Sequence, residues 1–211
     1  MESLKISKEC YCKLLSDTLR HYNRYFKETV APYSHKGGRE FNNDHYPFIP
    51  SNSILETVAV LDSLLLSIKR ATKTEYVPKF IDCGCGVGNI VLLAKELGYS
   101  SHGIEYDCKT YNIAKKLVPP DCRIIRGDIT KFESYENYDV IYFYVPISNG
   151  HKMDTFVRKV VDEAKIGSYV LSYGYSSRIL CSKKFKPVPT KIVGNVKDLY
   201  YTGHMSIYKR I

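Results

Sequence analysis

The sequence predicts an α/β fold. We expect a doubly wound, mostly parallel seven-stranded sheet ending in an antiparallel hairpin, with helices on both faces and an N-terminal helical extension. From residue 79 onward, short apolar segments alternate with helical ones, which is typical of a parallel sheet. The segment YDVIYFYV (138–145) is apolar almost throughout, as a strand covered on both faces should be. The last two strand-like segments have no helix between them and predict the hairpin.

The elements follow from local patterns. Residues 1–30 have helical apolar spacing, and residues 31–53 are rich in Pro, Gly, Asn and Ser, which predicts a loop. Ser53 and Glu56 form a capping box that predicts the start of the next helix. Gly98 is expected to end a later helix. The expected strands are 79–84, 101–105, 122–127, 138–145, 167–174, 190–195 and 205–211, and the helices between them are 89–98, 108–117 and 152–165.

The bulk composition restricts the function classes. The 211 residues suffice for one domain with a sizeable core, and 44% of them are hydrophobic. No apolar run approaches the roughly 18 residues that span a bilayer, and the first residues lack a signal-peptide core, so we expect a soluble cytoplasmic protein. The seven cysteines have no framework spacing, and both close pairs are C-x-C, which predicts neither disulfides nor a metal site.

The most informative stretch is FIDCGCGVGNI, residues 80–90. In parallel α/β sheets, ligands bind outside the carboxyl ends of the strands, which is where this loop is expected. Glycines let the backbone approach a ligand, and the N–H groups of the following helix face it. A dinucleotide fingerprint would need glycine at position 89, but Asn89 stands there. The pattern is an acid, Asp82, followed by G-x-G-x-G.

This stretch resembles the first motif of the class I (seven-β-strand) methyltransferases, which use S-adenosyl-L-methionine. Three further marks follow in the family's order: Glu105 ends the second strand, Asp128 follows the third, and YDVIYFYVPI matches the fourth strand and its catalytic loop. The resemblance covers residues 53–211 and implies a methyltransferase domain there, with residues 1–52 as an N-terminal helix and a loop covering cofactor and substrate. The cofactor-binding residues that it implies are Pro50, Ser51, Asp82, Gly84, Gly86, Gly88, Glu105, Tyr106, Asp128, Ile129 and Tyr144.

The loop after the fourth strand bears on the substrate. It reads Tyr144-Val145-Pro146-Ile147, whereas family members that methylate base or glutamine amino groups have Asn/Asp-Pro-Pro-Tyr/Phe there. The segment HYPFIPSNS (45–53) is similar to a segment of the small protein-lysine methyltransferases, which also have Val-Pro after the fourth strand. That resemblance implies a protein lysine as substrate, with Tyr144, Pro146 and Tyr46 as catalytic residues. The rings expected to wall the lysine channel are those of Tyr46, Phe48, Tyr144, Tyr173 and Tyr175.

Several alternatives stay open. Residues 176–211 hold eight basic residues and one acid, within a net charge of +9, so an RNA methyltransferase could use this segment to bind phosphates. The chain could also be a non-catalytic module that binds the cofactor. His45 and His151 are possible bases, although isolated histidines more often lie on the surface. Cys83 and Cys85 are expected to be small core residues and not reactive thiols.

Overall fold

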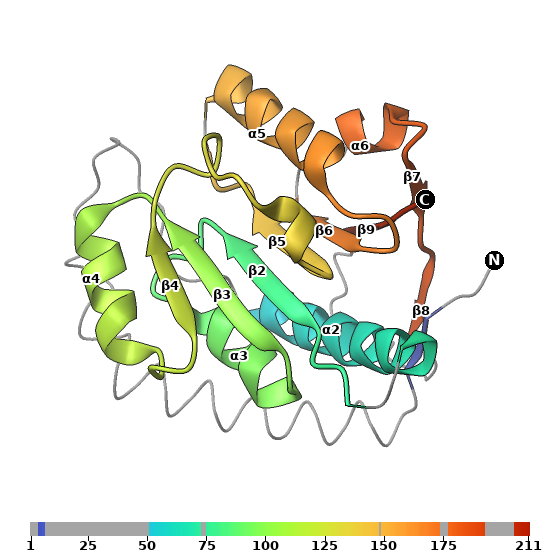
Figure 1. Ribbon diagram of the computed structural model, residues 1–211, viewed down its shortest axis with the longest axis horizontal. Helices are drawn as coiled ribbons and strands as arrows, with labels where there is room; N and C mark the ends of the chain where they lie inside the picture. Colours follow the sequence, from blue (N-terminus) through green and yellow to red (C-terminus); the bar gives the residue numbers. More distant parts are fainter. Residues whose placement is uncertain (1–3, 7–50, 73–74, 148, 174–176, 193–204) are drawn as a thin grey trace.

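The computed structural model describes residues 4–6, 51–72, 75–147, 149–173, 177–192 and 205–211. Its centre is a seven-stranded sheet with the strand order β4-β3-β2-β5-β6-β9-β7 (Figure 1). Only β9 runs in the opposite direction to the other six strands. The strands of this sheet are β2 (Lys79–Cys83), β3 (Ser100–Glu105), β4 (Arg123–Arg126), β5 (Val140–Tyr144), β6 (Tyr169–Tyr173), β7 (Phe185–Pro187) and β9 (Met205–Arg210). This arrangement confirms the predicted fold class.

Helices cover both faces of the sheet. They are α2 (Ser51–Ala71), α3 (Asn89–Leu97), α4 (Cys108–Leu117), α5 (Gly150–Glu163) and α6 (Ser177–Cys181), with a 3-10 turn, η3, at Tyr135–Asn137. One core lies between the sheet and α2 and α3, and it includes Leu61, Leu64 and Phe80. The core on the other face includes Ile81 and Phe156 and packs under α5 and α6 (Figure 1). None of the described helices is long and apolar enough to cross a membrane.

Alternation along β2 distributes its side chains between these two cores. Phe80 belongs to the core under α2 and α3, and Ile81 and Cys83 belong to the core under α5. Because successive side chains of a strand point to opposite faces, Asp82 lies on the same face as Phe80. Asp82 also stands in register with Tyr142 of the neighbouring β5. The acid of the first motif is therefore placed on the α2 side of the sheet.

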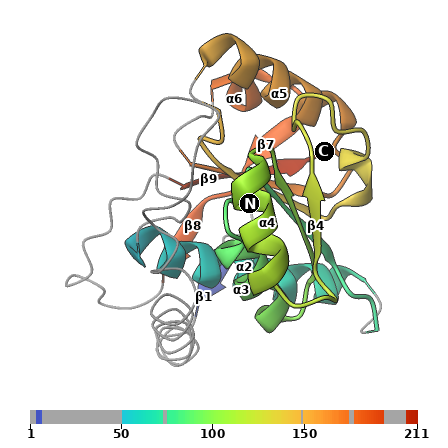
Figure 2. The same ribbon diagram turned by 90° about the vertical axis from the view of Figure 1, so that its left-hand side faces the viewer.

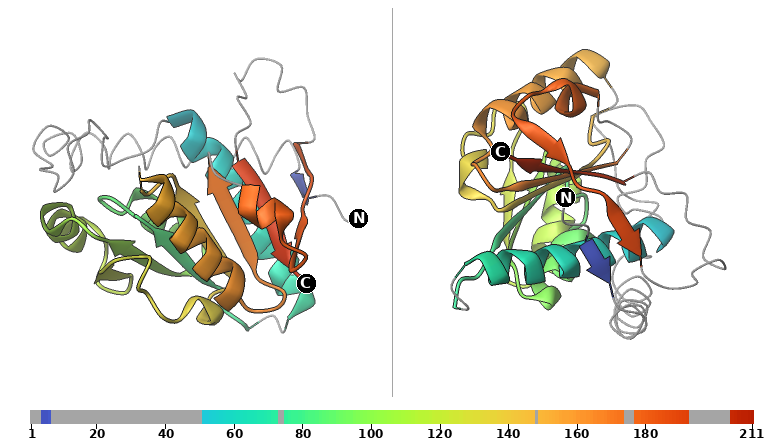
Figure 3. Two further views of the ribbon diagram at one scale, coloured as in Figure 1. Left: turned by 90° about the horizontal axis from the view of Figure 1, so that it is seen from above. Right: turned by 90° about the vertical axis from the view of Figure 1, so that its right-hand side faces the viewer.

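The predicted hairpin has the right sense but the wrong strands. β9 lies within the expected segment 205–211, but its antiparallel partners are β6 and β7 and not the residues described in the expected segment 190–195. Thr190–Ile192 forms β8, which pairs in parallel with β1 (Leu4–Ile6) in a separate two-stranded sheet. Figure 3 shows this pair beside α2. Strand pairing is decided by tertiary contacts, so the apolar pattern of TKIVGN could not identify its partner.

Two helix predictions at the N-terminus also need correction. Residues 4–6 form β1, whereas a helix was expected through residues 1–30. The helix α2 begins at Ser51, two residues before the predicted start, so Ser53 lies within the helix. The short α6 between β6 and β7 was not predicted. By contrast, α4 spans residues 108–117 as expected, and Gly98 ends α3 in the left-handed conformation.

Candidate functional site

The glycine loop joins β2 to α3 at the carboxyl edge of the sheet. Gly84, Gly86 and Gly88 have φ angles of +85°, +57° and +88°, a region that favours glycine. The N–H groups of Gly84 and Cys85 both donate to the carbonyl of Ile104 on β3, at 2.9 Å. The loop is therefore held against the neighbouring strand, and the amino end of α3 lies directly after it.

Glu105, at the end of β3, is bonded to this loop. Its Oε2 accepts from the N–H of Gly86 at 2.9 Å, and its Oε1 accepts from the N–H of Asp107 at 2.8 Å. Burial raises the pKa of the Glu105 carboxyl, although these backbone hydrogen bonds oppose the rise. A carboxylate offers about four lone-pair positions, so about two remain for further donors. Glu105 thus orders the glycine loop and keeps the capacity to accept from two hydroxyl groups.

Asp82 is the most deeply buried acid of the site, with 3% of its surface exposed. Among the described residues, no hydrogen bond to its carboxylate occurs. Burial, and secondarily the negative charge of Glu105, raise the pKa of Asp82 well above its usual value. A buried carboxylate without donors is costly, which makes this position hard to explain by stability alone.

The end of β4 adds the third acid. The N–H of Gly127 donates to the carbonyl of Glu105 at 3.0 Å, which brings the two strand ends together. Asp128 follows, and its Oδ1 accepts from both the N–H and the hydroxyl of Thr130, at 2.9 and 2.7 Å. Tyr106 is exposed, whereas Ile129 is buried in the core under α5, and its carbonyl accepts from the Tyr135 hydroxyl.

The loop after β5 packs directly on the glycine loop. A Cβ added at Gly84 would lie 2.5 Å from the Cβ of Pro146, so only glycine allows this approach. Val145, just before that proline, has a φ of +35°, which is rare and strained for a β-branched residue. Strain of this kind persists where surrounding contacts impose it, and it is frequent at functional sites. Of the predicted catalytic residues, Pro146 is therefore in contact with the motif.

Aromatic side chains line the ends of β5 and β6. The rings of Tyr144 and Tyr173 have centroids 5.0 Å apart, and those of Tyr142 and Tyr173 are 6.3 Å apart. Tyr144 is 39% exposed, whereas Tyr142 and Tyr173 are buried. The three rings form a series that leads from the surface toward the strand position beside Asp82.

The cysteines of the motif have the packing role that we expected. Cys83 and Cys85 are free and buried, and burial raises the pKa of both thiols well above the usual value. A Cβ at Gly103 would lie 2.7 Å from the Sγ of Cys85, so this glycine leaves room for the thiol. Among the residues that the structure describes, no cluster of His, Cys, Asp and Glu could hold a metal ion.

Some predicted residues cannot be placed. His45, Tyr46, Phe48, Pro50 and Tyr175 lie outside the described residues, as do the covering loop and the side chain of Ser51. His151 is exposed in the first turn of α5. The sequence reasoning missed Asp107, which caps α4 through Thr110 and whose amide binds Glu105. An aspartate directly before a predicted helix was the available signal.

These residues fit S-adenosyl-L-methionine. Gly84 and Gly88 leave out side chains at positions where a Cβ would meet Pro146 or Val118, so the loop keeps its shape around a bound group. Glu105 has acceptor capacity for the two hydroxyls of a ribose. Glu105 and Asp128 follow adjacent parallel strands, so both acids lie at the carboxyl edge where such a fold binds its ligand.

Comparisons with known proteins agree with this geometry. Residues 81–171 match the family model described as a methyltransferase domain. A search of curated proteins by sequence found no match. The magnesium protoporphyrin IX methyltransferase of Synechocystis PCC 6803, solved with bound S-adenosylmethionine, is 13% identical with a TM-score of 0.54, over 94% of this chain and 97% of that one. At this identity the likeness shows the fold.

Two further solved structures are similar over a shorter span. The glycopeptide N-methyltransferase MtfA is 16% identical with a TM-score of 0.41, over 50% of this chain and 48% of that chain. An S-adenosylmethionine-dependent methyltransferase from Mesorhizobium loti is 19% identical with a TM-score of 0.42, over 51% and 50%. The chain thus spans about half the length of these proteins. The match of residues 81–171 to the methyltransferase-domain family agrees with the sheet order and with the ordered motif residues, which are those of the class I S-adenosylmethionine-dependent fold.

Proposed function

We propose that this methyltransferase transfers its methyl group to a lysine amine of a protein. The observation that carries the proposal is the aromatic series at the ends of β5 and β6, where Tyr144 and Tyr173 lie 5.0 Å apart at the mouth of the site. Aromatic faces attract an ammonium group and present an apolar surface to the alkyl chain that bears it.

The side chains of the loop after β5 favour a substrate amine whose methylation needs no strong base from the protein. Val145, Pro146 and Ile147 supply no side-chain carboxylate or amide to accept from an exocyclic amino group of a base. S-adenosylmethionine would supply a methyl group on a sulfonium: the carbon–sulfur bond would break and the thioether leave as the nitrogen–carbon bond forms, after the ammonium has lost its proton to water. The residues of this chain then act by holding the partners in line and excluding water.

The roles proposed for the binding residues come from the family resemblance, and their bonds and packing support them. Glu105, fixed by the amides of Gly86 and Asp107, accepts from the ribose hydroxyls. We assign Asp128 to the adenine amino group, because it directly follows β4, the strand adjacent to the one that ends at Glu105. Pro146 packs on Gly84 and keeps the catalytic loop against the cofactor loop.

The cellular compartment and the alternative RNA substrate also bear on the proposal. Five described cysteines are free thiols, which supports a reducing compartment such as the cytoplasm. An RNA substrate held by the C-terminal segment has less support, because two of its cations are in ion pairs: Arg178 with Asp154, and Lys184 with Asp162.

Labelled S-adenosylmethionine tests the proposal. The chain is incubated with the labelled cofactor and a cell extract, and the label is sorted into protein, RNA and small molecules. We expect methyllysine in hydrolysed protein, and label confined to RNA or metabolites would exclude the lysine substrate. Cofactor bound without any transfer would identify a binding module.

Two variants then test the aromatic series on the labelled protein. Tyr144→Leu should lower kcat/KM for it roughly tenfold, as expected for the loss of a ring that holds a cation. Tyr144→Phe keeps the ring and should retain most of the activity. Equal activity of both variants would show that the ring of Tyr144 does not contribute to substrate binding.

A further inference from the structure

We propose that the edge of the molecule formed by α4 and β4 binds the phosphate backbone of a nucleic acid. This basic edge is defined by its exposed cations, which are Lys109, Lys115, Lys116, Arg123 and Arg126. The inference does not depend on the substrate proposed above, because it concerns a surface beside the site and not the site itself.

The charge of the basic edge is unbalanced. Residues 108–126 contain these five basic residues and a single acid, Asp121. That acid is itself paired with Lys95 of α3, at 2.9 Å. None of the five cations forms an ion pair with any residue that the structure describes. A cluster of exposed, unneutralised cations on one side of a domain is the electrostatic signature of a nucleic-acid-binding surface.

The fold gathers these cations at one edge of the molecule. β4 is an edge strand of the sheet, and α4 is the helix that packs on it. Figure 2 shows both elements on the side of the molecule that faces the viewer. Lys109 and Lys116 are seven residues apart, which places them on the same face of α4, about 10 Å apart along its axis.

The arginines extend this surface around the strand. Ile124 packs against Ala114 and Val118 at α4, so Arg126 points to the α4 side and Arg123 to the opposite side. Arg126 is also in register with Glu105 at the carboxyl end of β3. The basic edge therefore reaches the strand ends of the cofactor site.

In the basic C-terminal segment, residues 176–211, several cations already contact other residues of the domain. Besides the ion pairs of Arg178 and Lys184, the Arg210 guanidinium donates to the carbonyls of Ala164 and Lys184. Lys209 lies over the ring of Tyr169, 5.4 Å from its centroid. Four cations of this segment are thus engaged by described residues of the domain, whereas none of the basic edge is so engaged among those residues.

Stability explains only part of the pattern. Arginines on an edge strand hinder unwanted strand pairing, which accounts for Arg123 and Arg126. Cations in the last turn of a helix complement its dipole, which accounts for Lys115 and Lys116. Lys109 lies in the first turn of α4, where a cation is unfavourable, and neither explanation covers it.

The surface fits nucleic acid better than an acidic protein. Protein interfaces are built around buried aromatic and apolar anchors with a polar rim. The large hydrophobic side chains that are exposed elsewhere, such as Tyr144 and Ile166, have no counterpart among residues 108–126. A surface of cations without such anchors matches a regular row of phosphates.

The test compares two double variants that remove the same charge. Lys109→Gln with Lys116→Gln neutralises one face of α4, and Lys183→Gln with Lys186→Gln neutralises two exposed cations of the C-terminal segment. Binding of a short fluorescent single-stranded RNA is measured over a range of salt concentrations. Circular dichroism checks that each variant is folded, and polyglutamate serves as a competitor of equal charge type.

We expect the α4 variant to bind roughly 20-fold more weakly at 0.1 M salt, with a salt slope lower by about 1.4, since each phosphate contact on a single strand contributes about 0.7. The C-terminal variant should bind as the unmodified chain does. Absence of RNA binding, equal losses in both variants, or full displacement by polyglutamate at equal charge would overturn the inference. Affinity for S-adenosylmethionine and label transfer to protein should not change in the same variants. Failure of the nucleic-acid inference can therefore be told apart from failure of the proposed lysine substrate.

Discussion

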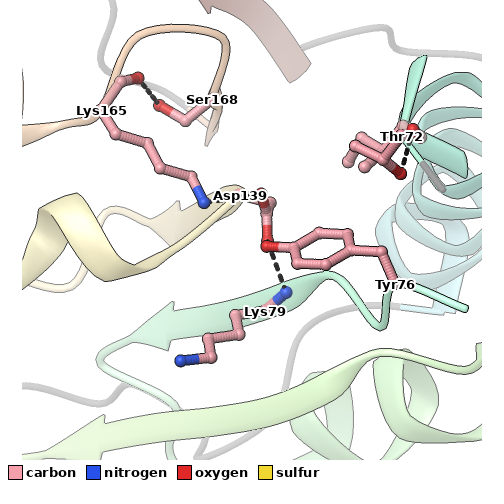
Figure 4. Close-up of polar contacts among 7 residues, drawn as sticks. Thr72, Tyr76, Lys79, Asp139, Lys165 and Ser168 are labelled. Carbon is pink, nitrogen blue, oxygen red and sulfur yellow. Dashed lines mark hydrogen bonds and ion pairs between the residues drawn. The ribbon is translucent and has the colours of Figure 1, made fainter.

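Two aspartates on neighbouring strands show how differently the two ends of the sheet are built. Asp139, just before β5, and Asp82, near the end of β2, are both buried, with 8% and 3% of their surfaces exposed. Asp139 is surrounded by donors: the Lys79 amide at 2.7 Å, the Tyr76 hydroxyl at 2.9 Å and the Lys165 Nζ at 2.7 Å (Figure 4). Asp82 accepts no hydrogen bond from the described residues. The charge of Asp139 is therefore paired within the fold, whereas that of Asp82 has no partner in the part of the chain that the structure describes.

The other residues at the two ends of the sheet differ in the same way as these two aspartates. At the amino end, the backbone amide of Asp139 donates to Lys79 and that of Tyr169 donates to Asp139, so one residue ties β2, β5 and β6 together. At the carboxyl end, Val145 is strained, Gly84 is closely packed and the buried Asp82 has no donor among the described residues. The difference indicates that the amino end stabilises the fold, while the carboxyl end keeps unfavourable features for binding.

Two glycines test this division most sharply. Gly84 and Gly167 have nearly equal φ angles, +85° and +87°, but a Cβ at Gly84 would meet Pro146 at 2.5 Å, and a Cβ at Gly167 would meet nothing within 4 Å. Gly84→Ala should weaken S-adenosylmethionine binding by about two orders of magnitude, because it adds overpacking to backbone strain. Gly167→Ala should cost about 1–2 kcal/mol of stability and leave the affinity unchanged. Calorimetric titration measures both, and equal affinities would contradict the assignment of the site.

Asp139→Asn tests the amino end. The amide keeps the size of the side chain but removes the charge that Lys165 faces and places an NH₂ group against one of the three donors. We expect the free energy of unfolding to fall by about 2–3 kcal/mol, less than for a fully buried pair, because Lys165 is partly exposed. The Kd for S-adenosylmethionine of the folded protein should not change. Urea denaturation measures the free energy of unfolding. A large change in Kd would contradict the division of roles between the two ends of the sheet.

Glu105→Gln tests how the carboxyl end is assembled. Glutamine keeps one acceptor oxygen but turns its NH₂ group toward either the Gly86 or the Asp107 amide, which are both donors. The loss of charge and of an acceptor should weaken S-adenosylmethionine binding about tenfold. Glu96→Gln, an exposed substitution on α3, is the control and should bind as the unmodified chain does. A Glu105→Gln variant with unchanged affinity would mean that this carboxylate does not hold the ribose.

The sequence predicted what local chemistry decides. Helix α4 was expected at its observed residues, and Gly98 was expected to end α3, because caps and apolar periodicity are properties of a few adjacent residues. Glu105 was predicted as a site residue from the resemblance to the family, and its place at the end of a parallel strand supported that prediction. The resemblance to a family added the roles that spacing could not supply.

Tertiary contacts decided what the sequence could not. The pairing of β9 with β7, and of β8 with β1, depends on which strands meet in space. The strain at Val145 and the contact between Gly84 and Pro146 arise where two loops far apart in the chain approach each other. The hydrogen bond from Gly86 to Glu105 is of the same kind, which is why the motif could be found in the sequence but its construction could not.

Asp82→Asn is the matched counterpart of Asp139→Asn, and its effect on stability should have the opposite sign. The folded state raises the pKa of Asp82 well above 3.8, so it holds the proton to a higher pH than the unfolded chain does. Stability must then fall as the pH rises from about 4 through the folded pKa, because the folded state binds more protons in that window. Asparagine removes this loss: the variant should be more stable at neutral pH, and its advantage should vanish below pH 4. Thermal melts across this range measure the difference, and a variant that is less stable at neutral pH would show that the carboxylate is satisfied in the fold, as Asp139 is.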